Sequence, residues 1–336
     1  MNITRRQLLV GSLVTAGGLV LAGCGRGEGT GGGDDAAAGP GFPVTIEHRF
    51  GTTTIERAPQ RVVTIGYSDH DAVMALGVPV AGVRYWYGPE GDAIQPWAED
   101  AARQTGSQPQ ILTMETPDPE KIAAASPDLV IGIYSDLEQG SYDLISAIAP
   151  TVAAPAQYAD YGVPWQETTR IVGRALGRSE QAEQAVAGVE ARFAAAREAN
   201  PQWAGKEVAV ATRSADKLGV FASHDLRSQF FTELGFVVPA RFDELSGENF
   251  YADLSFEQSN ELERDLVVWD QLSFTPGGRA TVEADPLISR LAVTREGRTV
   301  FLEGATELAF AWQTVLSLPA ALDGVLPLLE QALPKT

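Results

Sequence analysis

The chain has 336 residues, of which 44% are hydrophobic. One hydrophobic core rarely holds so many, so we expect two domains. The 44 Asp and Glu outnumber the 25 Lys and Arg, and a net charge of −19 excludes nucleic-acid binding, because phosphate backbones would be repelled. The single Cys excludes an intramolecular disulfide and a cysteine-based zinc or iron–sulfur site, and three His leave little for a buried transition metal.

The first 24 residues are typical of an exported lipoprotein. Arg5 and Arg6 precede an uncharged run, Leu8–Ala22, which is too short to span a bilayer comfortably and predicts a signal peptide over residues 1–23. The run ends in LAGC at 21–24, which resembles a bacterial lipobox and implies cleavage before Cys24 and lipid on its sulfur. A plain signal peptide with a chance Cys is the alternative. The paired arginines leave open whether export follows the Tat or the Sec route.

Residues 24–41 predict a lipidated Cys followed by a flexible linker. From Gly25 to Gly41, eight of 17 residues are Gly, a composition that favours a random coil. No strand precedes these glycines and no helix follows them, so we do not interpret them as a dinucleotide-binding loop.

The segment after Phe42 alternates between strand and helix patterns. Two short strands around Phe50-Gly51 predict a hairpin, and a strand–helix–strand unit over 61–83 is typical of a parallel sheet. The spacing of Val186, Val189, Phe193 and Ala196 predicts one long helix over 179–200. Further expected strands and helices are at 119–125, 128–133, 208–211, 230–234, 266–269 and 299–302.

Two glutamates occupy equivalent places in the two halves of the chain. Glu120 and Glu257 each precede an Asp-Leu-Val strand by eight residues. Each follows an N-cap type of residue, Asp118 or Ser255, so each lies at the second position of a predicted helix, near the positive end of its dipole. Simple helix capping would explain this pattern without any partner.

Several motifs together resemble the bacterial ferric-siderophore binding lipoproteins, the solute-binding components of ABC importers, and in particular the ferrioxamine-type proteins of actinobacteria. The resemblance covers about 42–330. The residues that carry it are 50–53, 61–63, 75–78, 120–122, 127–130, 285–287, 295–298 and 316–319.

This resemblance implies an α/β fold with two Rossmann-like lobes, bridged by one long helix, and a ligand cleft between the lobes. The expected domains are an N-lobe over 42–178, a bridging helix over 179–200 and a C-lobe over 201–336. It also implies that Glu120 and Glu257 dock on arginines of a membrane permease. The protein is then a monomer, anchored by lipid on Cys24 to the outer face of the cytoplasmic membrane.

In an open α/β sheet, ligands meet the loops at the carboxyl ends of the strands. Aromatic faces there would cover the apolar framework of a ferric hydroxamate, and arginines would meet its oxygens. The candidate ligand-binding residues, chosen by this rule and by the resemblance, are Arg84, Trp86, Tyr87, Tyr134, Arg213, Arg227 and Tyr251. The protein itself needs no iron ligand and no cofactor. Met114 departs from the family, where some hydroxamate binders place an arginine.

The sequence therefore predicts capture of a ferric siderophore, of the hydroxamate type because tricatecholates carry about three negative charges and suit a basic cleft. Haem or cobalamin is the alternative ligand, with Tyr134 or His224 as a possible axial ligand of haem. We expect no enzyme activity, because no nucleophile elbow, HExxH helix or P-loop is present. Ser68 and His70 are neighbours in a predicted loop, which does not make a catalytic triad.

Overall fold

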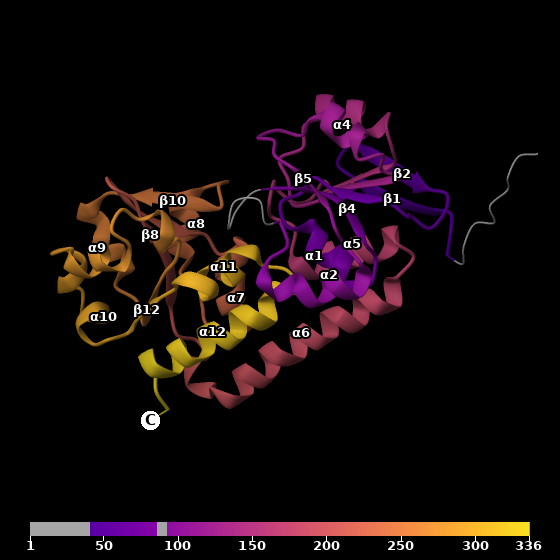
Figure 1. Cartoon of the computed structure of the whole chain (residues 1–336). Coiled ribbons are helices and arrows are strands. Elements are labelled where there is room, and N and C mark those ends of the chain that lie inside the picture. The colour runs from indigo at the N-terminus through magenta and orange to yellow at the C-terminus, as the bar shows by residue number, and fades with distance from the viewer. Residues whose placement is uncertain (1–40, 86–92, 336) are drawn as a thin grey trace, which may run out of the picture. The chain divides into compact units, whose positions relative to one another are not determined.

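The computed structural model describes residues 41–85 and 93–335, and two five-stranded sheets organise this part of the chain (Figure 1). The first sheet, with its helices, is the N-lobe. Its strands are all parallel, in the order β5-β4-β3-β6-β7. They are β3 Val62–Thr64, β4 Val80–Arg84, β5 Gln110–Leu112, β6 Leu129–Gly132 and β7 Thr151–Ala153. Nearly every residue of β3, β4, β6 and β7 is buried, as expected for a parallel sheet covered on both faces.

The predicted hairpin is confirmed as β1 Val44–His48 and β2 Gly51–Ile55, paired antiparallel. Successive parallel strands must be joined by a crossover connection, and helices supply these connections in the N-lobe. They are α1 Asp69–Ala75, the 3₁₀ helix η1 Pro96–Ala98, α2 Glu99–Thr105, α3 Pro119–Ala124, α4 Gln139–Ser146 and α5 Trp165–Ala175.

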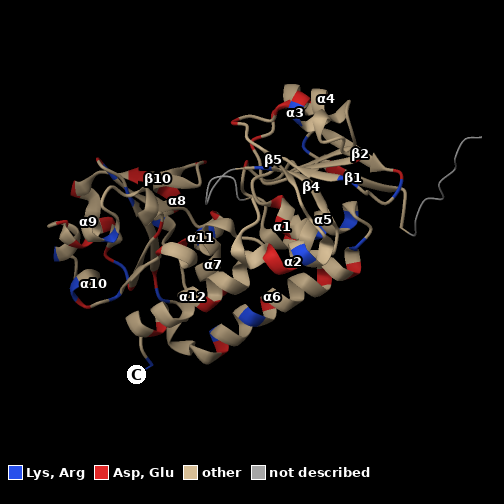
Figure 2. Ribbon diagram, viewed as in Figure 1, with Lys and Arg blue, Asp and Glu red and all other residues tan. Residues whose placement is uncertain are grey.

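One long helix, α6 Ser179–Ala199, joins the two sheets in sequence and ends one residue before the predicted boundary. The predicted apolar stripe is buried, from Val186 to Ala196. Both acidic and basic residues lie on the rest of the helix, so its outer face is solvated (Figure 2). Pro201 follows the C-cap residue Asn200 and prevents the helix from continuing.

The C-lobe sheet has the order β10-β9-β8-β11-β12. Strands β8, β11 and β12 are parallel, whereas β9 runs antiparallel to both β8 and β10. The strands are β8 Val208–Arg213, β9 Leu218–Phe221, β10 Tyr251–Leu254, β11 Leu266–Trp269 and β12 Thr299–Phe301. The hairpin β8–β9 was not expected from the sequence.

The C-lobe helices include α12, which packs beside α6 (Figure 1). The α-helices are α7 Leu226–Glu233, α8 Ala240–Ser246, α9 Gly278–Ala284, α10 Ala292–Arg295, α11 Gly304–Trp312 and α12 Ser317–Ala332. The 3₁₀ helices are η2 Pro201–Trp203, η3 Phe256–Leu262, η4 Leu272–Phe274 and η5 Ile288–Arg290. The predicted helix after Ser255 is thus the 3₁₀ helix η3.

The predicted fold class, α/β with two lobes bridged by one long helix, is confirmed. Trp269 and Trp312 belong to the hydrophobic core, with 1% and 2% of their surface exposed. Within residues 41–85 and 93–335, no helix combines the length and the apolar character needed to cross a membrane. The predicted signal peptide and Cys24 lie outside the described residues.

Candidate functional site

At the carboxyl ends of the N-lobe strands, three aromatic side chains form a tyrosine cluster: Tyr67, Tyr134 and Tyr161. Tyr67 follows β3, and its ring stacks on that of Tyr161 with centroids 5.7 Å apart and planes at 6°. Tyr134 follows β6 and meets Tyr161 edge to face at 5.3 Å. All three are partly buried, so each offers an aromatic surface next to the strand ends.

Arg84, the last residue of β4, supports this cluster from inside the lobe. Its guanidinium carbon lies 4.2 Å from the centre of the Tyr67 ring, and Nη2 donates to the Tyr67 hydroxyl at 2.8 Å. The same group donates to the backbone carbonyl of Glu115 and lies 3.3 Å from Asp136. With 1% of its surface exposed, Arg84 is engaged within the protein. A direct ligand contact by Arg84 stays a prediction.

A cavity of about 690 Å³ opens beside the tyrosine cluster, at the carboxyl ends of β4 and β5. Its lining residues are Tyr67, Tyr85, Thr113, Met114, Glu115, Thr116, Asp118 and Lys121. Two carboxylates and one ammonium group give this wall a net negative charge. The predicted Trp86 and Tyr87 lie outside the described residues.

Arg213, at the end of β8, is the C-lobe arginine with the looser internal contacts. Its guanidinium carbon lies 5.1 Å from the ring centre of Phe256, and Nη2 is 3.4 Å from the carboxylate of Asp285. Its Nε is buried and has no hydrogen-bond partner. A direct ligand contact by Arg213 stays a prediction.

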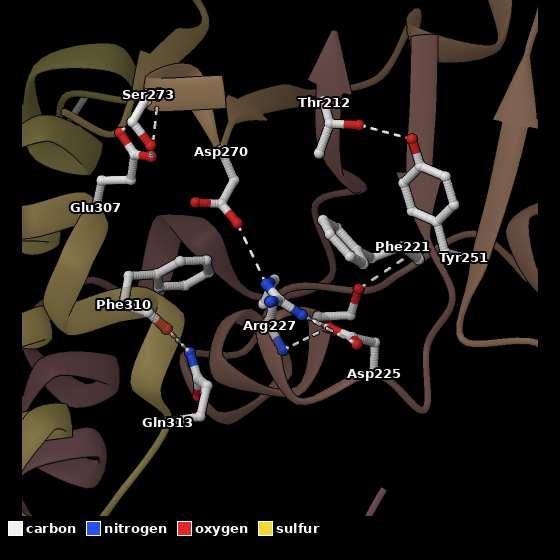
Figure 3. Close-up of polar contacts among 11 residues, drawn as sticks. Thr212, Phe221, Asp225, Arg227, Tyr251, Asp270, Ser273, Glu307, Phe310 and Gln313 are labelled. Atoms are coloured by element: carbon white, nitrogen blue, oxygen red, sulfur yellow. Dashed lines mark hydrogen bonds and ion pairs between the residues drawn. The ribbon is translucent and has the colours of Figure 1, made fainter. Parts of the chain in front are cut away.

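Arg227, in α7, lies instead between two buried carboxylates (Figure 3). Asp225 is 3.4 Å and Asp270 is 3.2 Å from its guanidinium nitrogens. Asp270 is 0% exposed, and burial raises its pKa to about 6, against the lowering effect of Arg227. Burial also raises the pKa of Asp225. When both acids are ionised, this group of three side chains has a net charge of −1, so Arg227 adds no net positive charge to the site.

Tyr251 begins β10, and its ring crosses the neighbouring strand β9 (Figure 3). Its hydroxyl is 2.8 Å from the hydroxyl of Thr212 on β8. The crossing requires Gly219, because a Cβ there would be 1.7 Å from the Tyr251 oxygen. Burial raises the pKa of Tyr251, so the phenol is neutral and can donate one hydrogen bond.

Tyr134 brings the N-lobe face close to the C-lobe face. Burial raises the pKa of its phenol to about 12, while Arg227 of the C-lobe acts in the opposite direction. Tyr134 and Leu226 also line the same small cavity. The predicted residues Tyr134 and Arg227 are therefore brought together, although they are far apart in sequence.

A second contact joins the two lobes. The carboxylate of Asp71, in α1, accepts hydrogen bonds from Trp97 Nε1 at 2.8 Å and from Thr314 Oγ1 at 2.6 Å. Thr314 lies between α11 and α12, and the preceding Gln313 has a left-handed backbone with φ of 49°. Asp71 is fully buried, so this contact is sheltered from water.

Glu120 and Glu257 are both exposed and both occupy the second position of their helices, α3 and η3, as predicted. Asp118 caps α3 by accepting from the Glu120 amide at 3.0 Å. Ser255 and Gln258 form the predicted capping box at η3. In both lobes, the cap is a different residue, so the glutamate carboxylates are not needed for capping.

The structure gives no support to the residues considered for metal or catalytic chemistry. Over residues 41–85 and 93–335, no three His, Cys, Asp or Glu side chains gather in a way that could hold a metal ion. His70 is fully buried beside Asp71, and burial lowers its pKa. His224 is exposed and lies 3.9 Å from Asp243.

Sequence reasoning missed two members of the tyrosine cluster as ligand candidates. Tyr67 follows strand β3, so the strand-end rule that selected Tyr134 could have found it. Tyr161 lies in the segment between β7 and α5 and has a φ of 60°. No local sequence pattern predicts that this loop residue stacks on Tyr67.

Comparisons with known proteins agree with this architecture. A family model described as periplasmic binding protein matches residues 62–306. The Fe(3+) dicitrate-binding periplasmic protein FecB of Escherichia coli K12 is 28% identical over 204 residues, which are 59% of this chain and 63% of FecB.

Two solved structures cover nearly the whole of the described fold. One is a periplasmic solute binding protein from Mycobacterium smegmatis, 29% identical, with 86% of this chain and 98% of that chain covered and a TM-score of 0.75. Another is PiaA of Streptococcus pneumoniae in complex with ferrichrome, 25% identical, with 86% and 98% covered and a TM-score of 0.74. Because the family model spans most of both sheets, this chain belongs to the periplasmic binding protein family.

Proposed function

We propose that this protein captures a ferric siderophore of the hydroxamate type outside the cytoplasm and delivers it to the permease of an ABC importer. The observation that carries the proposal is the gathering of aromatic and donor side chains at strand ends in both lobes, with the tyrosine cluster on one lobe and Arg213 and Tyr251 on the other. Its relatives are named as binding proteins: FecB binds ferric dicitrate, and PiaA was crystallised with ferrichrome. The chain is a binding protein and not an enzyme.

The charges of the site favour a hydroxamate complex over a tricatecholate. Each arginine near the strand ends has a carboxylate partner: Asp136 for Arg84, Asp285 for Arg213, and Asp225 with Asp270 for Arg227. A ferric tricatecholate has about three negative charges, and little positive charge is left to balance them. A ferric trishydroxamate, which is neutral or weakly cationic, needs aromatic surface and a few hydrogen-bond donors.

Haem is the alternative ligand, and two observations weigh against it. Tyr134 packs edge to face on Tyr161 and lies near Arg227, so its side chain is already engaged where the two lobes meet. The other predicted axial ligand, His224, is exposed and lies near Asp243. Cobalamin remains an alternative that the ligand panel below separates.

The test is a tryptophan-fluorescence titration of the purified protein. The panel contains ferrioxamine B, ferrioxamine E, ferrichrome, a ferric catecholate, ferric dicitrate, haem and cobalamin, with iron-free chelators as controls. Buried Trp165 and Trp269 lie close to Tyr134 and Asp270, so we expect saturable quenching by a ferric hydroxamate at submicromolar concentration. Tighter binding of the catecholate or dicitrate complex would contradict the hydroxamate assignment, and binding of haem or cobalamin alone would contradict the siderophore.

Delivery to the permease is assigned to Glu120 and Glu257. Neither glutamate caps its helix, both are exposed, and one lies on each lobe. Replacing both with Gln removes two negative charges without removing a cap, so ligand affinity stays unchanged while uptake into cells is lost. The matched control replaces Glu180 and Glu198 on α6, which are exposed on the bridging helix. Normal uptake by the Glu120→Gln, Glu257→Gln protein would refute the docking role.

Anchoring by lipid on Cys24 completes the proposal. Cys24 is the only cysteine of the chain and lies at the end of the signal-like run. Labelled palmitate supplied to cells is expected to enter the protein, and Cys24→Ser is expected to abolish the label and release the protein from membranes. A labelled Cys24→Ser protein, or an unlabelled wild-type protein, would contradict this anchor.

A further inference from the structure

The loop after β6 is held by a buried carboxylate from another element. Asp69, the first residue of α1, is 1% exposed. Its Oδ2 accepts from the Ile133 amide at 2.7 Å, and its Oδ1 accepts from the Tyr134 amide at 3.1 Å. These two amides follow the last residue of β6, where the strand ladder no longer supplies acceptors.

The two hydrogen bonds from the Ile133 and Tyr134 amides to Asp69, here called the Asp69 clamp, also hold Tyr67 indirectly. The Tyr67 amide donates to the Tyr134 carbonyl at 3.0 Å, so the backbones of the two tyrosines are tied together. Gly66 makes room for the carboxylate, because a Cβ at this position would lie 2.0 Å from Asp69 Oδ2. Through Tyr161, the two side chains then pack as one aromatic surface.

A carboxylate at this place is costly for the fold. Burial raises the pKa of Asp69 to about 6, although two amides act to lower it. The ionised acid therefore destabilises the folded state at neutral pH relative to an exposed acid. An Asn here would offer one acceptor oxygen for two amide donors, and its NH2 group would face the second amide, so the acid fits this place because its two oxygens accept from both amides.

We propose that Asp69 is a positioning residue of the ligand site: it fixes the backbone of Tyr134, and through Tyr134 that of Tyr67, so that the tyrosine cluster is preformed for the ligand. It touches no ligand itself. The contribution to affinity rests on the proposed function, whereas the fixing of the two amides does not.

Asp128 offers a matched control at the opposite end of the same strand. Its carboxylate also accepts from two successive amides, those of Gln60 and Arg61, both at 2.8 Å. Asp128 precedes β6 and Asp69 clamps the segment that follows it. Replacing either acid with Asn disturbs one double clamp in the same lobe, but only one of the two clamps adjoins the tyrosine cluster.

The first experiment measures affinity for the tightest-binding ferric complex of the panel. Asp69→Asn is expected to weaken binding about tenfold, and Asp128→Asn by less than about twofold. Gly66→Ala, which displaces the Asp69 carboxylate, should match Asp69→Asn. In a Tyr134→Ala background, Asp69→Asn should have a smaller further effect, because only the positioning of Tyr67 through the backbone of residue 134 is then lost. An equal loss in both backgrounds, or no loss in Asp69→Asn when Tyr134→Ala weakens binding, would overturn the proposal.

The second experiment needs no ligand. Hydrogen exchange of the Ile133 and Tyr134 amides is measured in the wild type, Asp69→Asn and Asp128→Asn. We expect these amides to lose protection in Asp69→Asn alone, while the amides of β3 and β4 stay protected in all three. If no ligand of the panel binds, or if Tyr134→Ala binds normally, the assignment of the tyrosine cluster as the ligand site fails. Hydrogen exchange of the Ile133 and Tyr134 amides then still tests whether Asp69 fixes this backbone. Protected Ile133 and Tyr134 amides in Asp69→Asn would refute the clamp.

Discussion

At the scale of single residues, the three arginines predicted to meet the ligand differ in what already surrounds them. Arg84 and Arg227 are buried among carboxylates, carbonyls and aromatic rings, whereas Arg213 is only partly buried and has one carboxylate partner, Asp285. A sequence shows that an arginine follows a strand, but the partners come from elsewhere: Asp285 is 72 residues from Arg213. The positions of candidate ligand-binding arginines could therefore be predicted from the sequence. Which of them already have partners within the protein could not.

Arg227 provides a prediction about stability. Arg227→Met leaves Asp225 and Asp270 buried without their cation, so we expect a loss of about 3 kcal/mol in the free energy of unfolding at pH 7. Arg241→Met is the control, since Arg241 is exposed and pairs with Glu244 and Glu261, and it should cost less than about 1 kcal/mol. Urea unfolding of both variants measures the difference, and equal losses would show that the buried pairs are unimportant.

At the scale of elements, most of the fold follows from patterns within the chain. The buried stripe of α6 lies where its spacing predicted, and strands β3, β4 and β6 of the N-lobe lie at the predicted places, whereas β5 and β7 were not predicted. The antiparallel strand β9 escaped prediction, because Leu218–Phe221 is short and becomes a strand only by pairing with β8 and β10. For such short segments, pairing with neighbouring strands in the folded protein determines the secondary structure.

Two glycines in different elements should respond to alanine in opposite ways. Gly219→Ala in β9 places a Cβ against the Tyr251 ring, so we expect Tyr251 to leave Thr212 and stability to fall by about 1–3 kcal/mol. Gly188→Ala in α6 meets nothing within 4 Å and should raise stability by up to about 1 kcal/mol. Thermal unfolding compares the pair. Stabilisation by Gly219→Ala would show that Tyr251 does not cross β9 in solution.

At the scale of the whole molecule, buried acids make stability depend on pH. The pKa of Asp270 rises from 3.8 to about 6 on folding, so its contribution to stability is fully present below pH 3.8 and is lost as the pH rises through 6. This rise corresponds to about 3 kcal/mol. His48 and His70, whose pKa values are lowered by burial, act oppositely, since their contribution is lost as the pH falls.

Comparison with Asp270→Asn isolates the acid from the histidines. The Asn side chain does not titrate, so the free energy of unfolding of the variant, relative to the wild type, should be higher at pH 7.5 than at pH 4 by about 3 kcal/mol. Urea unfolding at several pH values measures this difference. A difference that does not change with pH would mean that Asp270 has an ordinary pKa in the folded protein.

The hydrogen bond between Asp71 and Thr314 has a consequence for the order of events during synthesis. The two residues are separated by 243 positions, and the ribosome makes the N-lobe first. Until Thr314 has emerged, the carboxylate of α1 lacks one of its two hydrogen-bond donors. The lobe made first is therefore completed by a residue made near the end, and in a chain cut before Thr314 the buried carboxylate of Asp71 would keep only the hydrogen bond from Trp97.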